Sequence, residues 1–586
     1  MNIYFFQCQE DYNGNMYLPY SSGMLWAYVS QFAEIRENYN LVDIYFEKID
    51  PNVYLDKIKD KAPDIALFSN YGWNTGYHLS IAKLIKETYP DCKIIIGGPN
   101  AQQSKEYLKE HYYVDISVWG EGEQTLYELL RALITNDDLS NVHGLAYIKN
   151  NQYTSTPVRD RFKDVNVLPS PYLKGIFDSF YKRYNYNFMP VWETNRGCPY
   201  SCTFCDLGAD YYSKVHQFDT ERLLQEIQYF SDNKIEYVEI ADANFGIIKR
   251  DLELVKFIRQ KYLETGYPQK INATWAKSSP DRIFEMAEIL DSMNRGGVTL
   301  ALQSSNKTAL SNIKRVNIAN DKLAIISKKY SENKMQTYHD FIIGLPGETL
   351  ESWKEGLLYV LDINPEGWIF GHPLEAYKNT EFADPNYISK HDLKFAVTPQ
   401  VSFFAQRRKN VPIEYGNYVI STNTLSKEDY VESFLFKWFL ISNHSLGWTN
   451  YIGKNSNMPL SEFYPLLYDW MKNNDCLMRE QYYETKKCLE HTIDTGDFWG
   501  RQMFGEDDIY WEYESASCII YERNRNRFLD DMAKFLKNCL PDINLNIIKL
   551  NDQQLICHQR DKKDLDFREF CINIYWYGRR KKAWKI

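Results

Sequence analysis

Short apolar runs alternate with amphipathic stretches through the first two thirds of the chain. Near the N-terminus, the apolar runs 3–6, 65–68 and 93–96 predict buried strands, and the apolar positions from Ile81 to Ile85 predict a helix. Strands that alternate with helices in this way are typical of a doubly wound parallel sheet. Such sheets bind ligands at the carboxyl ends of their strands, so the loops there are candidate sites.

The same alternation returns in the middle of the chain, after about residue 215. Strand-like apolar runs are separated by segments whose apolar residues fall on one helical face. This repeated unit predicts an α/β domain of the barrel type, in which functional residues gather at the carboxyl ends of the strands. The predicted strands are 237–240, 271–275, 298–302 and 341–343, and the predicted helices are 223–230, 254–258, 283–293 and 323–329.

Beyond about residue 390 the pattern is less regular. The stretch 402–424 is predicted to be extended, and 426–446 has an apolar helical face. Aromatic-rich segments such as 508–513 fit core packing better than stacking on a substrate. We therefore expect a mixed, mainly helical C-terminal domain.

Length and composition indicate a folded protein of several domains. The chain has 586 residues, of which 44% are hydrophobic and 25% charged, and it is too long for a single core. A net charge of −10 argues against a nucleic-acid partner, and no apolar run is long enough to span a bilayer. Without a secretory leader or disulfide spacing, we expect a cytoplasmic protein with reduced thiols. The basic stretch 579–585 is expected to be a solvated terminus.

Three cysteines lie within eight residues in the middle of the chain. Cys198, Cys202 and Cys205 have the spacing C-x3-C-x2-C, and Phe204 directly precedes the third thiol. A short loop can turn three thiolates toward one soft-metal centre, such as an iron–sulfur cluster, zinc or Cu(I). A structural zinc site needs a fourth protein ligand, and His216 lacks the paired spacing for that role. We therefore favour a [4Fe–4S] cluster with one open iron over zinc, and over three unrelated buried cysteines.

This segment resembles the signature of the radical S-adenosylmethionine (SAM) superfamily, which has an aromatic cofactor-binding residue at the place of Phe204. The resemblance implies that the three cysteines each ligate one iron and that SAM chelates the fourth. It also gives roles to polar residues near the predicted strand ends, although each alone could be a capping turn. The implied SAM contacts are Asp242 and Asn244 to the amino group, Gln303 and Ser304 to the ribose, and Gly344 to Glu348 around the adenine.

Three glycine-containing loops, 69–74, 97–100 and 119–123, precede the cysteines. Taken singly, each is plain turn chemistry. In this order they resemble the cobalamin-binding domain that precedes the catalytic domain in one branch of radical SAM enzymes. Many cobalamin domains ligate cobalt through Asp-x-His-x-x-Gly, which is absent here and often absent from that branch. The implied corrin or nucleotide-tail contacts are Ser69, Gly97, Gly98, Gly120 and Gly122.

The expected fold class is α/β, with three domains in chain order. A doubly wound, Rossmann-like cobalamin-binding domain occupies 1–145, and a linker with several prolines occupies 146–185. A partial (β/α) barrel, the radical SAM domain, occupies 186–390, where 369–374 resembles the final barrel strand. The mainly helical remainder, 391–586, is expected to recognise or cap the substrate.

The implied cofactors are a [4Fe–4S] cluster, SAM and cobalamin, and they define the leading hypothesis. It is a cobalamin-dependent radical SAM C-methyltransferase, which acts on an unactivated carbon of a small molecule or peptide through a 5′-deoxyadenosyl radical and methylcobalamin. A flavodoxin or ferredoxin is the expected reductant. One alternative is a cyclase or rearrangement enzyme with the same cofactors and no methyl transfer.

Two further alternatives stand behind these. A non-catalytic iron–sulfur electron carrier or a cobalamin-responsive binding protein would keep a cofactor without the reaction. A methylthiotransferase is disfavoured because that group uses three further N-terminal cysteines, whereas only Cys8 and Cys92 precede the cluster here.

Overall fold

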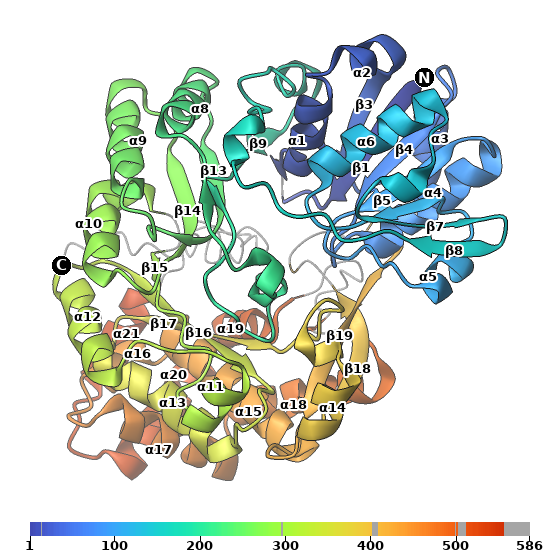
Figure 1. Ribbon diagram of the computed structural model, residues 1–586. Coiled ribbons are helices and arrows are strands. Elements are labelled where there is room, and N and C mark those ends of the chain that lie inside the picture. The colour runs from blue at the N-terminus through green and yellow to red at the C-terminus, as the bar shows by residue number, and fades with distance from the viewer. Residues whose placement is uncertain are drawn as a thin grey trace.

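The structure is a computed structural model that describes residues 1–12, 14–294, 297–400, 403, 408–498, 500–501 and 511–555. An N-terminal α/β domain, a central strand region with outer helices and a helical C-terminal region follow one another along the chain (Figure 1). The basic stretch 579–585 and residues 508–510 of the aromatic-rich segment lie outside the described residues. Within the described ranges, no helix combines the length and apolar character needed to cross a membrane.

Within the described residues, the N-terminal domain contains one mixed sheet. Its strand order is β3 (Asn40–Glu47), β1 (Asn2–Gln9), β4 (Ile65–Ser69), β5 (Lys93–Gly97), β6 (Ile116–Val118), β7 (Leu145–Lys149), β8 (Gln152–Ser155). The strands from β3 to β6 are parallel, and β7 and β8 add an antiparallel edge. The parallel strands thus have the flavodoxin-like order 2-1-3-4-5, whose ligand site lies at the switch point between β1 and β4. The doubly wound prediction is confirmed.

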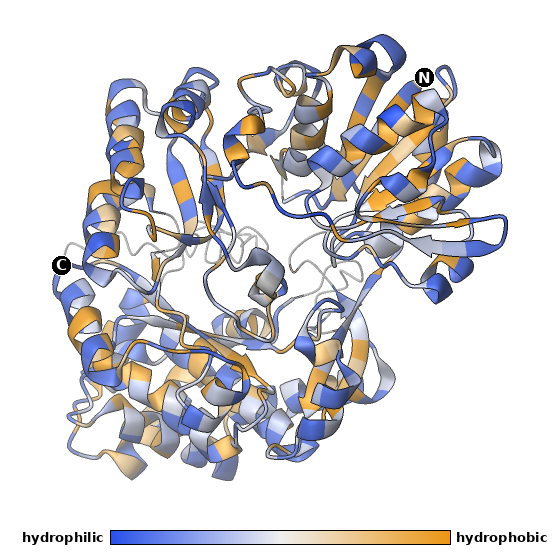
Figure 2. Ribbon diagram, in the orientation of Figure 1, coloured by the Kyte–Doolittle hydropathy of each residue, from blue (hydrophilic) through white to orange (hydrophobic). Residues whose placement is uncertain are grey.

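Helices cover both faces of this sheet because each presents an apolar stripe to it. In α6, Leu126, Leu129 and Leu130 recur at helical spacing and are buried. Figure 2 shows hydrophobic strands inside and hydrophilic outer helix faces. The helices of this domain are α1 (Tyr20–Val29), α2 (Ala33–Asn38), α3 (Pro51–Ile58), α4 (Thr75–Thr88), α5 (Lys105–Glu110), α6 (Gly122–Thr135) and η1 (Leu139–Asn141).

The described part of the central domain is a partial barrel made of two parallel sheets. One contains β10 (Val191–Trp192), β13 (Tyr237–Phe245) and β14 (Lys270–Trp275), and the other β15 (Val298–Thr299), β16 (Thr337–Ile343) and β17 (Trp368–Pro373). A bridge between Ile271 and Asn294 links them. The outer helices are α8 (Thr220–Asp232), α9 (Asp251–Thr265), α10 (Pro280–Leu290), η5 (Asp291–Met293), α11 (Lys307–Asn312), α12 (Asn320–Glu332) and α13 (Leu350–Ile363).

Three barrel strands differ from their predicted bounds by more than one residue, and one of them, β16, begins at Thr337, four residues before its predicted start. β13 extends to Phe245, so Asp242 and Asn244 lie inside the strand instead of after it. The apolar run ends at Ile240, but the strand continues through an irregular pairing with β14 between Ile240 and Phe245. Such an irregularity accommodates the two polar residues inside the strand. β15 stops at Thr299, although the apolar run continues to residue 302, because the regular pairing with β16 ends there and resumes only as a bridge between Gln303 and Phe341.

The segment between the two α/β domains is tied to both. β2 (Asn15–Tyr17) pairs in parallel with β9 (Asn187–Met189), so an early excursion of the chain meets the start of the barrel. The expected linker 146–185 begins with β7 and β8 of the N-terminal sheet and continues mostly as turns and irregular backbone. The other short elements are η2 (Val165–Val167), α7 (Phe180–Arg183), β11 (Asn195–Arg196), η3 (Asp206–Gly208), η4 (Asp210–Tyr212) and β12 (His216–Gln217).

The C-terminal region is mainly helical, as predicted, with one hairpin at its start. Its second strand lies within the stretch 402–424 that was expected to be extended, whereas its first strand precedes that stretch. The elements are η6 (Glu381–Ala383), α14 (Pro385–His391), β18 (Lys394–Gln400), β19 (Glu414–Ser421), α15 (Lys427–Leu440), η7 (Ile441–Ser445), α16 (Asn450–Lys454), α17 (Leu460–Asn473), α18 (Leu477–Thr495), α19 (Tyr513–Arg523), α20 (Arg525–Cys539) and α21 (Asn546–Gln554).

The hydrophobic cores extend across the expected domain boundaries. One core joins the inner face of the N-terminal sheet to β10, β13 and β14 of the barrel. A second core joins Phe341 of β16 and Ile369 of β17 to C-terminal helices, including Trp438 of α15. Each half of the barrel is therefore packed against a different neighbouring region.

Candidate functional site

The cysteine loop follows β11 at the mouth of the barrel. Cys198 and Cys202 are buried, and Cys205 is partly exposed. The turn into the loop requires glycine at 197, where φ is +112° and a Cβ atom would lie 2.1 Å from the Lys214 carbonyl oxygen. The turn out of the loop has a similar requirement at Gly208, where a Cβ would lie 2.0 Å from the Cys202 carbonyl oxygen.

Polar and cationic groups surround the sulfurs of this loop. The Asn244 amide donates a hydrogen bond to the Cys198 sulfur over 3.2 Å, and the Arg315 guanidinium donates to the Cys202 sulfur over 3.8 Å. Lys277 follows β14, and its ammonium lies 5.0 Å from the Tyr200 ring centre. Burial lowers the pKa of Lys277 to about 8, while the nearby thiols act in the opposite direction. The positive charges of Arg315 and Lys277 therefore favour the thiolate form of these cysteines.

The donor set fits a cluster held by three cysteines. Among the described residues, no group of three or more His, Cys, Asp and Glu side chains could hold a metal ion, so the three thiols are not gathered around a single ion. In a four-iron cluster each thiolate bonds a different iron, which needs a wider arrangement. An amide and a guanidinium on two of the sulfurs suit an anionic cluster.

Asp242 connects the end of β13 to the start of the cysteine loop. Its buried carboxylate accepts hydrogen bonds from the Thr194 nitrogen at 2.8 Å, the Thr194 hydroxyl, the Asn195 nitrogen at 3.2 Å and the Asn195 amide at 2.6 Å. Burial raises the pKa of Asp242 to about 7, and these hydrogen bonds oppose the rise. Each carboxylate oxygen thus accepts two hydrogen bonds from described residues. Because an oxygen has two lone pairs, Thr194 and Asn195 occupy both acceptor positions of each.

The residues expected around the ribose and adenine lie together beyond β15 and β16. The Ser304 hydroxyl donates to the Glu348 carboxylate, and both side chains are buried. Gln303 is half-buried and has φ +65°. Its backbone nitrogen donates a hydrogen bond to the Asp340 carbonyl, and its carbonyl accepts one from the Ile342 nitrogen. Gly344 has φ +96°, which favours glycine in the turn after β16.

The loops expected to bind cobalamin all lie at the carboxyl edge of the N-terminal sheet. Ser69 ends β4 and Gly97 ends β5, where the Asn70 nitrogen donates to the Gly97 carbonyl at 2.7 Å. Gly98 has φ +99°, and a Cβ there would lie 2.5 Å from the Asn70 carbonyl oxygen. Gly120 has φ +80° and faces the Tyr211 hydroxyl of the cysteine loop, and Gly122 begins α6.

Orphaned donors at this edge fit a polar cofactor. Asn70 is fully buried, and its side-chain nitrogen has no hydrogen-bond partner in the described structure. The Trp119 ring nitrogen, at the end of β6, is also buried without a partner there. Buried donors normally find acceptors, and the amide groups of a bound cobalamin would supply them. Trp73 stacks on Tyr71 in the same region, with ring centres 4.6 Å apart.

His78 is a structural histidine in α4. Its Nε2 accepts a hydrogen bond from the Cys8 nitrogen at 3.0 Å, and its Nδ1 lies 3.0 Å from the Asn70 side-chain oxygen. Burial lowers the pKa of His78 to about 3. Both ring nitrogens are thus used inside the domain, which agrees with the absence of the cobalt-ligating motif.

A buried ion network joins the two cofactor regions. Arg196, two residues before the first cysteine, pairs with Glu123 of α6 at 2.7 Å and with Glu193 at 2.9 Å. The Tyr20 hydroxyl of α1 donates to Glu193 at 3.1 Å, and the Glu121 nitrogen donates to the Tyr211 hydroxyl at 3.1 Å. The cysteine loop is therefore fixed against the carboxyl edge of the N-terminal sheet.

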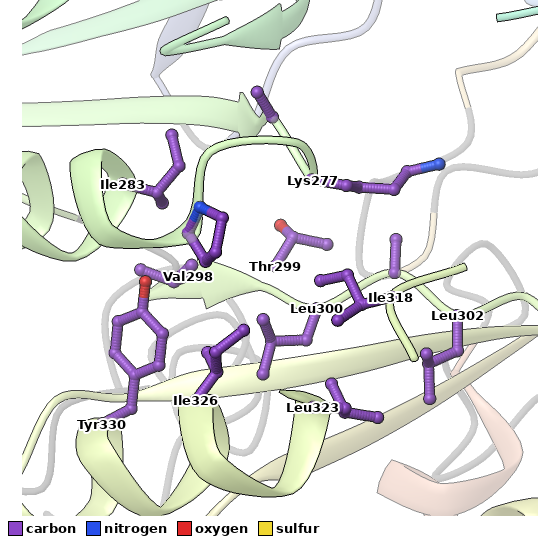
Figure 3. Close-up of a pocket in the computed structure, with 13 residues that line it drawn as sticks. Lys277, Ile283, Val298, Thr299, Leu300, Leu302, Ile318, Leu323, Ile326 and Tyr330 are labelled. Atoms are coloured by element: carbon purple, nitrogen blue, oxygen red, sulfur yellow. The ribbon is translucent and has the colours of Figure 1, made fainter. Parts of the chain in front are cut away.

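An apolar pocket lies where the two barrel sheets separate (Figure 3). It is lined by residues such as Ile283 of α10, Leu300, and Leu323 and Tyr330 of α12. The Lys277 side chain extends away from these apolar groups (Figure 3). This pocket is a packing gap between sheets and outer helices, and the polar site lies beyond Lys277.

Two residues of the site were not predicted from the sequence. Arg315 lies in a turn after α11 that carries no motif, and only its approach to Cys202 reveals it. Glu375 lies just beyond β17, and its environment is set by the hairpin β18–β19 from a later part of the chain. Neither has a sequence signal of its own.

Comparison with known proteins gives consistent matches. Residues 192–359 match the radical SAM superfamily, and residues 24–130 match the B12 binding domain. The chain is 30% identical over 487 residues to the cobalamin-dependent radical SAM methyltransferase TokK of Streptomyces tokunonensis, covering 81% of this chain and 71% of that protein. It is 29% identical over 498 residues to the 2-(S-pantetheinyl)-carbapenam-3-carboxylate methyltransferase of Streptantibioticus cattleyicolor, covering 82% and 72%.

A solved structure shares the fold. The cobalamin-dependent SAM radical enzyme OxsB, with aqua-cobalamin and SAM bound, matches with a TM-score of 0.57 at 15% identity, covering 94% of this chain and 84% of that chain. The similarity therefore extends over the N-terminal sheet, the partial barrel and the C-terminal helices.

Proposed function

Because the chain belongs to the cobalamin-dependent radical SAM methyltransferase family, we propose that Cys198, Cys202 and Cys205 hold its [4Fe–4S] cluster. The protein is a radical SAM enzyme, and its cofactors are the cluster, SAM and cobalamin. When bound, SAM and the cluster supply the hydrogen-abstracting radical, and cobalamin supplies the methyl group. The remaining question is what this chain's own residues contribute.

The observation that carries the assignment is the 2.7 Å ion pair between Arg196 and Glu123. Arg196 begins the cysteine loop, and Glu123 lies one residue after Gly122, at the edge of the sheet where we propose that cobalamin binds. The pair therefore fixes both cofactor regions at one opening. Transfer of a methyl group to a carbon of the acceptor needs this positioning and the exclusion of water.

Near the cluster, we assign different roles to the residues expected to bind SAM. Asn244 and Arg315 stabilise the thiolates of Cys198 and Cys202 by donating hydrogen bonds to them. Lys277 pairs with no carboxylate of the described residues, so its ammonium is available to the carboxylate of SAM. Asp242 acts as a positioning residue, because its oxygens are already occupied by Thr194 and Asn195, not as a contact to the SAM amino group.

Farther from the cluster, we keep the prediction that the same residues contact the ribose and the adenine of SAM. Gln303, Ser304 and the turn Gly344–Glu348 gather beyond β15 and β16, which supports them as the nucleoside-binding part of the site. On the cobalamin side, we propose that Ser69, Gly97, Gly98, Gly120 and Gly122 border the corrin. The unpartnered nitrogens of Asn70 and Trp119 would donate to its amide groups.

The methyl acceptor is a small molecule or a peptide-like compound, in line with the relatives. We propose a small molecule that is methylated at an unactivated carbon, with a flavodoxin or ferredoxin as the electron donor. Ring closure or rearrangement without methyl transfer is the alternative, and it differs in the fate of the methyl group of SAM.

The test uses anaerobically reconstituted protein with cobalamin, a strong reductant and SAM labelled in its methyl group. The wild type is expected to form labelled methylcobalamin and 5′-deoxyadenosine, and the triple variant Cys198→Ala/Cys202→Ala/Cys205→Ala to lose iron and 5′-deoxyadenosine. Label that never enters cobalamin would favour the alternative without methyl transfer. Iron binding and SAM cleavage in the triple variant would refute the cluster assignment.

A further inference from the structure

Glu375 lies at the point where the last barrel strand meets the C-terminal hairpin. Beyond β17 the chain continues extended, so that Glu375 forms a bridge with Tyr418 of β19, and the Ala376 nitrogen donates to the Asn417 carbonyl at 2.8 Å. Residues at the carboxyl end of a barrel strand face the reaction space. Glu375 is therefore positioned by both the barrel and the hairpin.

The carboxylate of Glu375 has hydrogen-bond donors but no cation. The Gln400 amide of β18 donates to it at 2.5 Å, and Tyr377 also hydrogen-bonds to it. No Lys, Arg or His of the described residues forms an ion pair with Glu375. Burial raises the pKa of Glu375 to about 7, because its ionised form lacks a compensating positive charge.

This group lies between the two cofactor regions. Asp206, directly after the third cysteine, is close enough to act electrostatically on Glu375, and one of its oxygens is buried without a hydrogen-bond partner in the described structure. On the other side, a Cβ at Gly72 would lie 3.9 Å from the Gln400 amide and 4.0 Å from the Tyr377 ring. Gly72 belongs to the loop 69–74 that is expected to border cobalamin.

Aromatic faces are exposed beside this carboxylate. Tyr377 is 40% exposed, and Trp73, next to Gly72, is 54% exposed and stacked on Tyr71. Aromatic faces and carboxylates both attract ammonium groups when water is partly excluded. A buried carboxylate that no protein cation neutralises either takes up a proton or is stabilised by a cation of a ligand.

We infer that Glu375 is a specificity-determining residue that receives an ammonium-type cation of the methyl acceptor. The inference rests on the proposed function, because it assumes that the acceptor enters between the cysteine loop and the loop 69–74. SAM also carries an ammonium group and a sulfonium, so the same carboxylate could serve either ligand. The experiment separates these two sources.

Two probes of equal shape test the charge preference. Phenethylamine and 2-phenylethanol differ in whether they carry an ammonium group, and their binding to full-length protein with cluster and cobalamin is measured by ligand-observed NMR. The wild type is expected to bind the amine at least about tenfold more tightly, the scale of one charge-assisted contact. Glu375→Gln should bring the two affinities within about twofold of each other. An equal affinity in the wild type, or an unchanged preference in Glu375→Gln, overturns the inference.

Further variants guard against a folding defect or a general charge effect. Glu375→Asp keeps the charge and should retain the amine preference, as should Glu428→Gln, which removes an exposed charge in the first turn of α15. Loss of the preference in Glu428→Gln would overturn the inference. The affinity for SAM, measured by equilibrium dialysis, should be the same in Glu375→Gln and the wild type. A tenfold loss there would assign Glu375 to SAM and overturn the acceptor role.

Measuring the formation of methylcobalamin distinguishes a failure of the proposed methyl transfer from a failure of the proposed role of Glu375. Glu375→Gln should form it from labelled SAM at the wild-type level, since this step needs no acceptor. If the wild type forms none, the proposed methyl transfer fails, while the amine preference still decides the role of Glu375.

Discussion

The side-chain amide of Asn244 lies 3.2 Å from the sulfur of Cys198 and donates a hydrogen bond to it. Reduction adds negative charge to a cluster and its sulfurs, and a donor stabilises that charge, so Asn244 raises the reduction potential. Asn244→Ala is expected to lower the potential at near wild-type iron content and to slow SAM cleavage. Potentiometric titration followed by electron paramagnetic resonance measures the shift.

A matched asparagine provides the control for that measurement. Asn272 in β14 donates to Glu239 at 2.9 Å and contacts no cysteine, so Asn272→Ala should leave the potential unchanged. The assigned role would be contradicted if both variants had the wild-type potential, or if both shifted it equally.

Asp242 should be intolerant of its amide isostere. Asp242→Asn replaces an oxygen that accepts two hydrogen bonds with a nitrogen that donates, so donors from Thr194 and Asn195 lose their acceptor. Leaving buried donors unsatisfied costs about 1–3 kcal/mol each. We expect a lower melting temperature and reduced iron incorporation, measured by calorimetry and iron analysis. Asp281→Asn, at an exposed carboxylate, should match the wild type, and unchanged iron loading in Asp242→Asn would contradict the positioning role.

Glu414 should hold the C-terminal hairpin against the N-terminal domain. Its buried carboxylate accepts hydrogen bonds from the nitrogens of Gly76 and Tyr77, both at 2.8 Å, at the N-terminus of α4. Glu414→Gln removes the negative charge from this helix end, at a cost of about 1–2 kcal/mol. Hydrogen exchange at those two amides should speed up about fivefold to thirtyfold.

The control for this contact is a glutamate that lies in the first turn of a different helix. Glu351→Gln in α13 lies on an exposed surface and should not change exchange at Gly76 or Tyr77. Equal exchange at these amides in Glu414→Gln and the wild type would show that the hairpin is held by other contacts.

His78 should make the protein less stable in mild acid. Its folded pKa of about 3 lies below the ordinary value near 6.5, so the neutral ring stabilises the fold fully above pH 6.5 and progressively less as the pH falls toward 3. At pH 5 the loss amounts to about 2 kcal/mol. The melting temperature of the wild type should therefore fall between pH 7 and pH 5.

The variant His78→Asn tests whether this residue causes the fall. It removes the proton uptake, so its melting temperature should fall less than that of the wild type over the same pH range, although it starts lower. His339, whose pKa burial lowers to about 4, contributes equally to both proteins. A fall of the same size in both proteins would rule out His78 as a source.

The sequence predicts local structure well where apolar runs are continuous. The strands β4 and β5 fall within one residue of their predicted bounds, because each is a short apolar run that is buried by helices on both sides. β13 extends past its predicted end, because polar residues interrupt the apolar run in its last five positions, and these are kept extended by tertiary hydrogen bonds to Asp242. The cofactors were implied by the resemblance that the cysteine spacing and the loop order have to a known family, since the residues alone left other metals open.

The missing parts of the prediction depend on contacts between distant segments. Arg315 reaches Cys202 across 113 residues, and Glu414 reaches Gly76 across 338. Neither contact leaves a periodic pattern or a motif near the residue itself. The same reason applies to Glu375, whose burial and hydrogen bonds come from a hairpin that lies later in the chain.

The shared cores restrict how this protein could be divided or recombined. Trp438 of α15 completes the packing around Phe341 and Ile369, so a shortened chain that ends near residue 390 would expose two barrel strands to water. A chimera that borrowed only the C-terminal helices of a relative would mismatch that interior. A functional chimera should therefore exchange the second half of the barrel together with the C-terminal helices. If relatives have evolved to methylate different acceptors, we expect the sequences of these two segments to have changed together.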